Sequence, residues 1–147
     1  MATVYDLAAR RRLHARIDAL TPEAKPRWGC MSVGQMVVHC DLHLRHSLAD
    51  FPVARMSVPV GRFPLNLLVI YILPTPKGVV TMDELRDPVM ENWNDARAQL
   101  KTDLDRIGAL APGTEMPVHA AFGRIGHHAH GWLAHKHLSH HLAQFGV

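Results

Sequence analysis

The sequence contains few cysteines and no long uninterrupted apolar run. Its two cysteines, Cys30 and Cys40, are too few for a disulfide-stabilised scaffold and lack the close spacing of a zinc knuckle or redox motif. The longest apolar run, residues 63–73, is interrupted by Pro64 and Asn66 and is shorter than the roughly 20 residues of a membrane-spanning helix. The first residues also lack the charged-then-apolar layout of a secretory signal peptide. We therefore expect a cytoplasmic protein without a membrane partner.

A strong excess of either charge is also missing. The 147 residues include 16 basic and 13 acidic side chains, for a formal net charge of +3. The one basic cluster, Arg10, Arg11 and Arg12, is interpreted as a solvated helix face, because nucleic-acid binding needs basic residues concentrated on a face or arm. No dinucleotide-binding, phosphate-loop or serine-hydrolase motif occurs, and no paired carboxylates stand out. We therefore predict no nucleic-acid partner, and the catalytic residues stay unknown.

The pattern of apolar residues predicts four helices, over about residues 4–20, 32–48, 87–108 and 130–145. Thr3 is the expected cap of the first helix. Ser32 and Gln35 form a capping box at the start of the second. Asp87 followed by Pro88 is the expected start of the third.

Prolines crowd the middle of the chain. Six of the ten prolines lie between residues 52 and 88, where they prevent long helices. Residues 65–73 are compatible with a short buried helix or a strand. The sequence therefore predicts one domain over residues 1–147, an all-α antiparallel four-helix bundle with an irregular, proline-rich middle segment.

Histidine is abundant: 12 are present, seven of them between residues 127 and 141. On a helical projection, His39, His43 and His46 share one narrow sector beside the apolar stripe. The last helix repeats this arrangement with His137 and His141. Two histidines four residues apart can bind one metal ion, and a third from another helix completes a set of three ligands. Three protein ligands leave coordination positions open for reaction.

Other histidines carry weaker signals. A lone pair of histidines on a helix arises by chance in a histidine-rich chain, and a histidine beside the core is often only hydrogen-bonded. His14 and His119 give no signal, and Cys40 is expected in the core. We expect four histidines of the C-terminal region on the surface: His127, His128, His130 and His135.

Three segments resemble the DinB/YfiT-like superfamily of metal-binding four-helix bundles, in a branch of unknown function. They are residues 137–146, residues 27–32 with Gln35 and His39, and residues 119–123. The resemblance implies a metal site formed by His39, His137 and His141. Gln144, one turn later, would be a pocket residue or would contact a ligand residue. His43 offers itself as a fourth or substitute ligand, which the family pattern does not require.

The resemblance also implies classes of function. The expected cofactor is a divalent metal ion, zinc or nickel in the first place and iron or manganese as alternatives. The expected function is that of a metal-dependent transferase or hydrolase that activates a bound water or a low-molecular-weight thiol. The alternative is a non-catalytic metal-binding or ligand-sensing module, with residues 65–73 as a candidate homodimer contact.

Overall fold

The computed structural model describes residues 2–52, 54, 64–75 and 89–147. Within these ranges the chain is all-helical, as predicted, and forms no strand, although one isolated bridge joins His119 and Gly123. None of the described helices has the length and apolar character needed to cross a membrane. The helices, in chain order, are α1 (Leu7–Asp18), α2 (Val33–Ser47), α3 (Leu65–Tyr71), α4 (Trp93–Gly108) and α5 (His127–Gln144).

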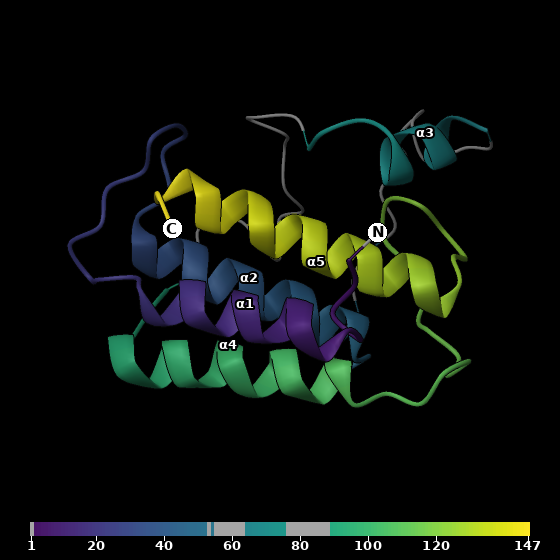
Figure 1. The fold of residues 1–147 in the computed structure, drawn as a ribbon, viewed down its shortest axis with the longest axis horizontal. Helices are drawn as coiled ribbons and strands as arrows, with labels where there is room; N and C mark the ends of the chain where they lie inside the picture. Colours follow the sequence, from purple (N-terminus) through teal and green to yellow (C-terminus); the bar gives the residue numbers. More distant parts are fainter. Residues whose placement is uncertain (1, 53, 55–63, 76–88) are drawn as a thin grey trace.

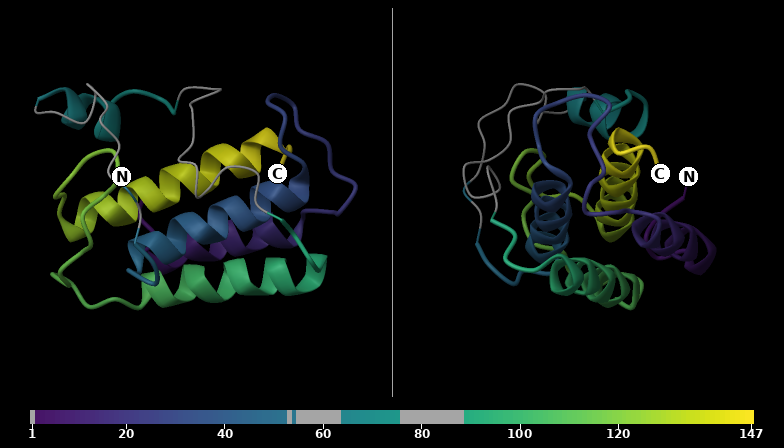
Figure 2. Two further views of the ribbon diagram at one scale, coloured as in Figure 1. Left: turned by 180° about the vertical axis from the view of Figure 1, so that it is seen from behind. Right: turned by 90° about the vertical axis from the view of Figure 1, so that its left-hand side faces the viewer.

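The four longer helices lie side by side, and the short α3 lies outside them (Figure 1). In the end-on view of Figure 2 the four helices occupy the corners of a square, with α2 beside α4 and α5, and α1 beside the same two helices. The helix α3 is held against α5, where the indole of Trp132 donates to the Ile70 carbonyl and Lys136 donates to the Leu73 carbonyl.

Contacts between helix ends fix the direction of each helix. Arg10, near the start of α1, donates to the carbonyl of Gly108 at the end of α4, so α1 and α4 are antiparallel. The backbone N–H of Val4 donates to the carbonyl of Gly131, near the start of α5, so α1 and α5 run parallel. Arg106, late in α4, pairs with Asp50, just after α2, so α2 and α4 also run parallel. The pair α2 and α5 is antiparallel. The bundle is therefore mixed, with two parallel and two antiparallel neighbouring pairs, and not antiparallel throughout as expected, because the long connection between α2 and α4 lets these two helices run in the same direction.

Local capping residues determine where two helices begin. The predicted capping box is confirmed: Ser32 accepts from the backbone N–H of Gln35, and the Gln35 side chain accepts from the backbone N–H of Ser32. The expected cap of the first helix is wrong, because Asp6, not Thr3, accepts from the first backbone N–H groups of α1. The hydroxyl of Thr3 accepts instead from the backbone N–H of Tyr5.

The other two long helices begin at places that the sequence signals did not indicate. The helix α4 begins at Trp93 with Asn92 as its cap, while the expected start, Asp87 and Pro88, lies outside the described residues. The helix α5 begins at His127, three residues earlier than expected. Residues 65–71 form a helix and not a strand, and of its side chains only that of Ile70 is buried.

The core lies between the four longer helices. Cys40 belongs to it, as predicted, and is 1% exposed. The burial of these apolar side chains is the main stabilising term of the fold. The core members are Val4, Leu13, Ile17, Leu20, Val33, Met36, Val37, Cys40, Leu44, Leu100, Leu104, Ile107, Ala134, Leu138, Leu142 and Phe145.

Candidate metal site

Three imidazoles meet where α2 lies against α5. His39 comes from α2, and His137 and His141 come from successive turns of α5. One ring nitrogen from each of the three lies within 4.8 Å of the others, so this group could hold a metal ion. The ring centroids are 5.0 Å apart for His39 and His137, 4.9 Å for His39 and His141, and 4.6 Å for His137 and His141. The structure therefore brings together the three residues that the resemblance implied.

Burial keeps two of the three rings, those of His137 and His141, uncharged at neutral pH. His39 is 3% exposed and His141 is 8% exposed. Desolvation, reinforced by the neighbouring imidazoles, lowers the pKa of His137 well below its usual value and that of His141 to about 4. Neutral imidazole has the free lone pair that binds a metal ion. The Nε2 atom of His137 is also buried with no hydrogen-bond partner in the described part of the chain, which fits a donor set left open for an ion.

His141 is in addition held by a neighbouring amide. Its Nδ1 atom lies 2.9 Å from Oε1 of Gln144, and the contact is buried. The Nε2 atom of Gln144 donates in turn to the carbonyl of Trp28 at 2.6 Å. Gln144 thus contacts a candidate ligand residue, and it also links that residue to the loop before α2.

His43 lies beside the group but in a different orientation. Its ring stacks on that of His137, with centroids 4.0 Å apart and an angle of 9° between the planes. Because the lone pairs of an imidazole lie in the plane of its ring, two parallel stacked rings do not aim them at a common point. In this structure His43 therefore packs against a candidate ligand, and the group of three closes without it.

A second group of histidines was missed by the sequence reasoning. His119 lies with its ring centroid 5.7 Å from that of His130, 6.2 Å from that of His46 and 6.3 Å from that of His43. His130, expected on the surface, is only 1% exposed, and His119, which gave no signal, is 8% exposed. Burial lowers the pKa of His119 to about 3 and that of His130 to about 4.

Backbone contacts explain how these two rings are held. The Nδ1 atom of His119 accepts from the backbone N–H groups of Ala121 and Phe122, and Nε2 of His130 lies 3.1 Å from the carbonyl of Pro117. His130 shares its helix face with His137, seven residues away, and this spacing was the available signal for its burial. His119 lies in a loop, where no periodicity exists to reveal it. As expected, His128 is exposed, whereas His127 and His135 are half-buried.

A pair of carboxyl groups, also missed, lies between α2 and α4. Burial and a hydrogen bond to Asp103 raise the pKa of Asp41 to about 7. Although burial opposes it, hydrogen bonds from Gln99 and Arg106 lower the pKa of Asp103. One proton therefore stays on Asp41 at weakly acid pH while Asp103 is ionised. The pair is part of the packing between α2 and α4, and neither carboxyl belongs to the three-histidine group.

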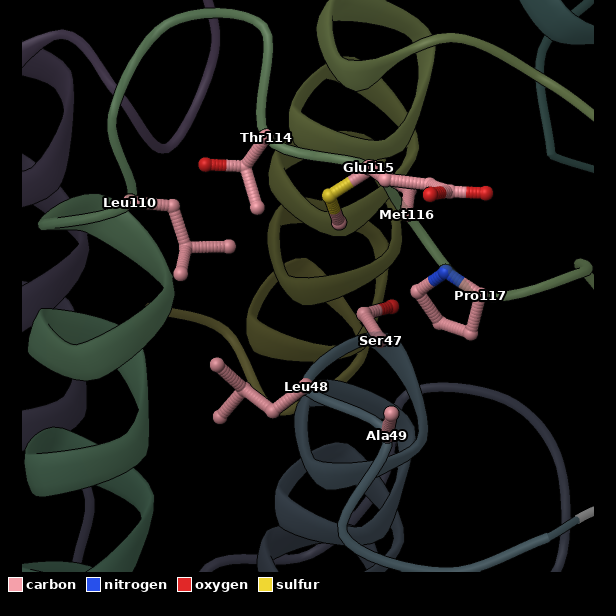
Figure 3. Close-up of a pocket in the computed structure, with 8 residues that line it drawn as sticks. All are labelled: Ser47, Leu48, Ala49, Leu110, Thr114, Glu115, Met116 and Pro117. Carbon is pink, nitrogen blue, oxygen red and sulfur yellow. The ribbon is translucent and has the colours of Figure 1, made fainter.

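A hollow at the C-terminal end of α2 is lined by none of these histidines. Residues 47–49 and Leu110 line it together with residues 114–117 (Figure 3). Its one ionisable side chain, Glu115, is exposed and lies near Arg124. None of the three candidate metal ligands lines this hollow.

Comparison of the chain with models of known protein families, with curated proteins and with solved structures found no match. The functional argument therefore rests on the residues themselves.

Proposed function

We propose that this protein is a DinB-like four-helix bundle that binds a divalent metal ion, zinc or nickel in the first place, through His39, His137 and His141. The observation that carries the proposal is the convergence of three largely buried imidazoles from two helices. Three protein ligands leave coordination positions free, as in reactive metal sites. When bound, the ion supplies Lewis acidity that lowers the pKa of a water or thiol.

The chain's own residues would contribute binding and orientation. The helices α2 and α5 fix the three rings in place, and the amide of Gln144 holds His141 from behind. The stacked ring of His43 restricts the rotation of His137. These features support a metal-dependent transferase or hydrolase that acts on a small molecule or a low-molecular-weight thiol.

Metal content tests the site directly. Protein purified without a histidine tag or a nickel column is analysed for bound metal, and the expected loading is about one ion per chain. His137→Ala should lose the ion, whereas His128→Ala, an exposed histidine of the same helix, should keep it. Equal loading of the two variants, or no metal in the wild type after incubation with zinc and nickel, would refute the site.

A second function is a non-catalytic metal-binding or ligand-sensing module that pairs through α3. It is favoured by the exposure of Leu65, Leu67 and Ile72, which are 45%, 45% and 73% exposed. Assays of thiol conjugation and ester hydrolysis with added zinc, nickel or manganese separate the two functions. Turnover that a chelator abolishes supports the enzyme, and metal binding without turnover supports the module.

A further inference from the structure

The hydrogen bonds of Gln144 determine which nitrogen of His141 carries the proton. A backbone carbonyl only accepts, so the Gln144 group 2.6 Å from the Trp28 carbonyl must be the amide NH₂. The carbonyl oxygen of the Gln144 amide then faces Nδ1 of His141 at 2.9 Å. Because that oxygen also only accepts, Nδ1 must carry the hydrogen. Neutral His141 is left with its lone pair on Nε2.

The loop before α2 holds the Gln144 amide in this orientation. The backbone N–H of Arg27 donates to the main-chain carbonyl of Gln144 at 2.7 Å and so fixes the loop beside this residue. Gly29 adopts a φ of +80°, and a Cβ atom there would lie 2.7 Å from Nε2 of Gln144. A side chain at residue 29 would therefore push the amide away from its place, so the close approach of loop and helix requires glycine.

We propose that Gln144 is a positioning residue that sets the tautomer of His141, and that the loop of residues 27–31 controls metal affinity through it. Residues that hold the second nitrogen of a ligating histidine fix its orientation and raise its basicity. Coupling of this kind is reciprocal, so an ion on His141 also stabilises the position of the loop. The affinity part of this inference rests on the proposed metal site, whereas the tautomer part concerns the metal-free chain.

The first experiment measures the tautomer of His141 by ¹⁵N NMR of the metal-free, full-length protein. In the wild type the hydrogen is expected on Nδ1, and in Gln144→Leu a mixture of both tautomers is expected. Gln144→Glu should again place it on Nδ1, because burial against the Trp28 carbonyl keeps a proton on the carboxyl, whose O–H donates to that carbonyl while the other oxygen accepts from Nδ1. Gln35→Leu is the matched control, since it removes another glutamine that bonds to the backbone but does not touch His141. A hydrogen on Nε2 in the wild type, or an unchanged tautomer in Gln144→Leu, overturns the inference.

The second experiment measures the affinity for cobalt(II), whose visible absorption reports its ligands. Gln144→Leu is expected to bind about 10- to 100-fold more weakly, the range seen for lost partners of ligating residues. Gln144→Glu should stay within about tenfold of the wild type. This rescue separates positioning from a loss of folding, which the two variants would share.

A pair of glycine substitutions tests the control by the loop. Gly29→Ala and Gly113→Ala introduce the same backbone strain, at φ values of +80° and +83°, but a Cβ at residue 113 meets nothing within 4 Å. Only Gly29→Ala should weaken cobalt binding, and adding it to Gln144→Leu should cause no further loss. Equal effects of the two glycine variants, or additive losses in the double variant, overturn the control by the loop. If the wild type binds no cobalt, zinc or nickel, the proposed function and the proposed influence of the loop on metal affinity fail together. The tautomer of His141 is decided separately by the NMR experiment.

Discussion

The buried histidines should make the metal-free protein lose stability in weak acid. His119, His130 and His141 have folded-state pKa values of about 3, 4 and 4, all lowered chiefly by desolvation, against about 6.5 in an unfolded chain. A base whose pKa is lower in the folded state is protonated first in the unfolded state. Its contribution to stability is therefore present above pH 6.5 and is lost as the pH falls below that value.

The size of this effect follows from the number of protons taken up on unfolding. As the pH falls from 7.5 to 5.5, each of the three histidines lowers the free energy of unfolding by about 1.4 kcal/mol, or about 4 kcal/mol together. Asp41 acts in the opposite direction, because its folded-state pKa is raised to about 7. Over the same interval it raises the free energy of unfolding by about 2 kcal/mol. The pKa values of His43, His46 and His137 are lowered as well, so the net loss should be at least about 2 kcal/mol.

Urea unfolding of the chelator-treated protein, followed by far-UV circular dichroism, measures this loss at the two pH values. His119→Phe should reduce the loss by about 1.4 kcal/mol, because one fewer imidazole is protonated on unfolding. His128→Phe, which alters an exposed residue, is the control and should leave the difference unchanged. A wild-type free energy of unfolding that is equal or higher at pH 5.5 would refute the assignment of these rings as buried and neutral.

Three further changes test other parts of the structure. As the pH rises from 5 to 8.5, the free energy of unfolding of Asp41→Asn should increase by about 2 to 3 kcal/mol relative to that of the wild type, because the wild-type carboxyl loses its proton beside Asp103. Parallel urea titrations of the two proteins check this. Lys136→Met removes the ammonium that donates to the carbonyls of Val69, Ile70 and Leu73, and should speed amide hydrogen exchange in α3 while exchange in α2 stays unchanged. Asp6→Ala should cost about 1 kcal/mol of unfolding free energy through loss of the α1 cap, and a cost below about 0.3 kcal/mol would contradict that role.

The sequence predicted features that depend on neighbouring residues. The capping box of Ser32 and Gln35 is such a feature, because its two hydrogen bonds join residues three apart. The periodic placement of His39, His137 and His141 on two helices is another, and it was sufficient, with the resemblance, to name the group that the structure assembles. The start of α4 was placed too early because an Asp-Pro pair and an asparagine are competing cap signals, and local sequence does not rank them.

Features that depend on distant segments were beyond sequence reasoning. His130 contacts the loop that contains Pro117 and His119; its spacing from His137 indicates the helix face on which it lies but not the loop that covers it. The contact between Gln144 and the Trp28 carbonyl joins residues 116 positions apart. The carboxyl pair of Asp41 and Asp103 likewise requires α2 and α4 to lie side by side, which became evident only from contacts between the helices.

The same burial gives the three-histidine group its proposed affinity for metal and the metal-free fold its expected sensitivity to acid. Desolvation favours neutral imidazole, which leaves a lone pair for a cation on the rings of His137 and His141. An ion that binds only the folded chain adds stability that grows with its concentration, while protons compete for the same nitrogens as the pH falls. The second group, around His119, is expected to differ, because Nδ1 of that ring already accepts from backbone N–H groups. Added metal should therefore offset the acid loss that arises from His137 and His141, and leave the part that arises from His119 and His130.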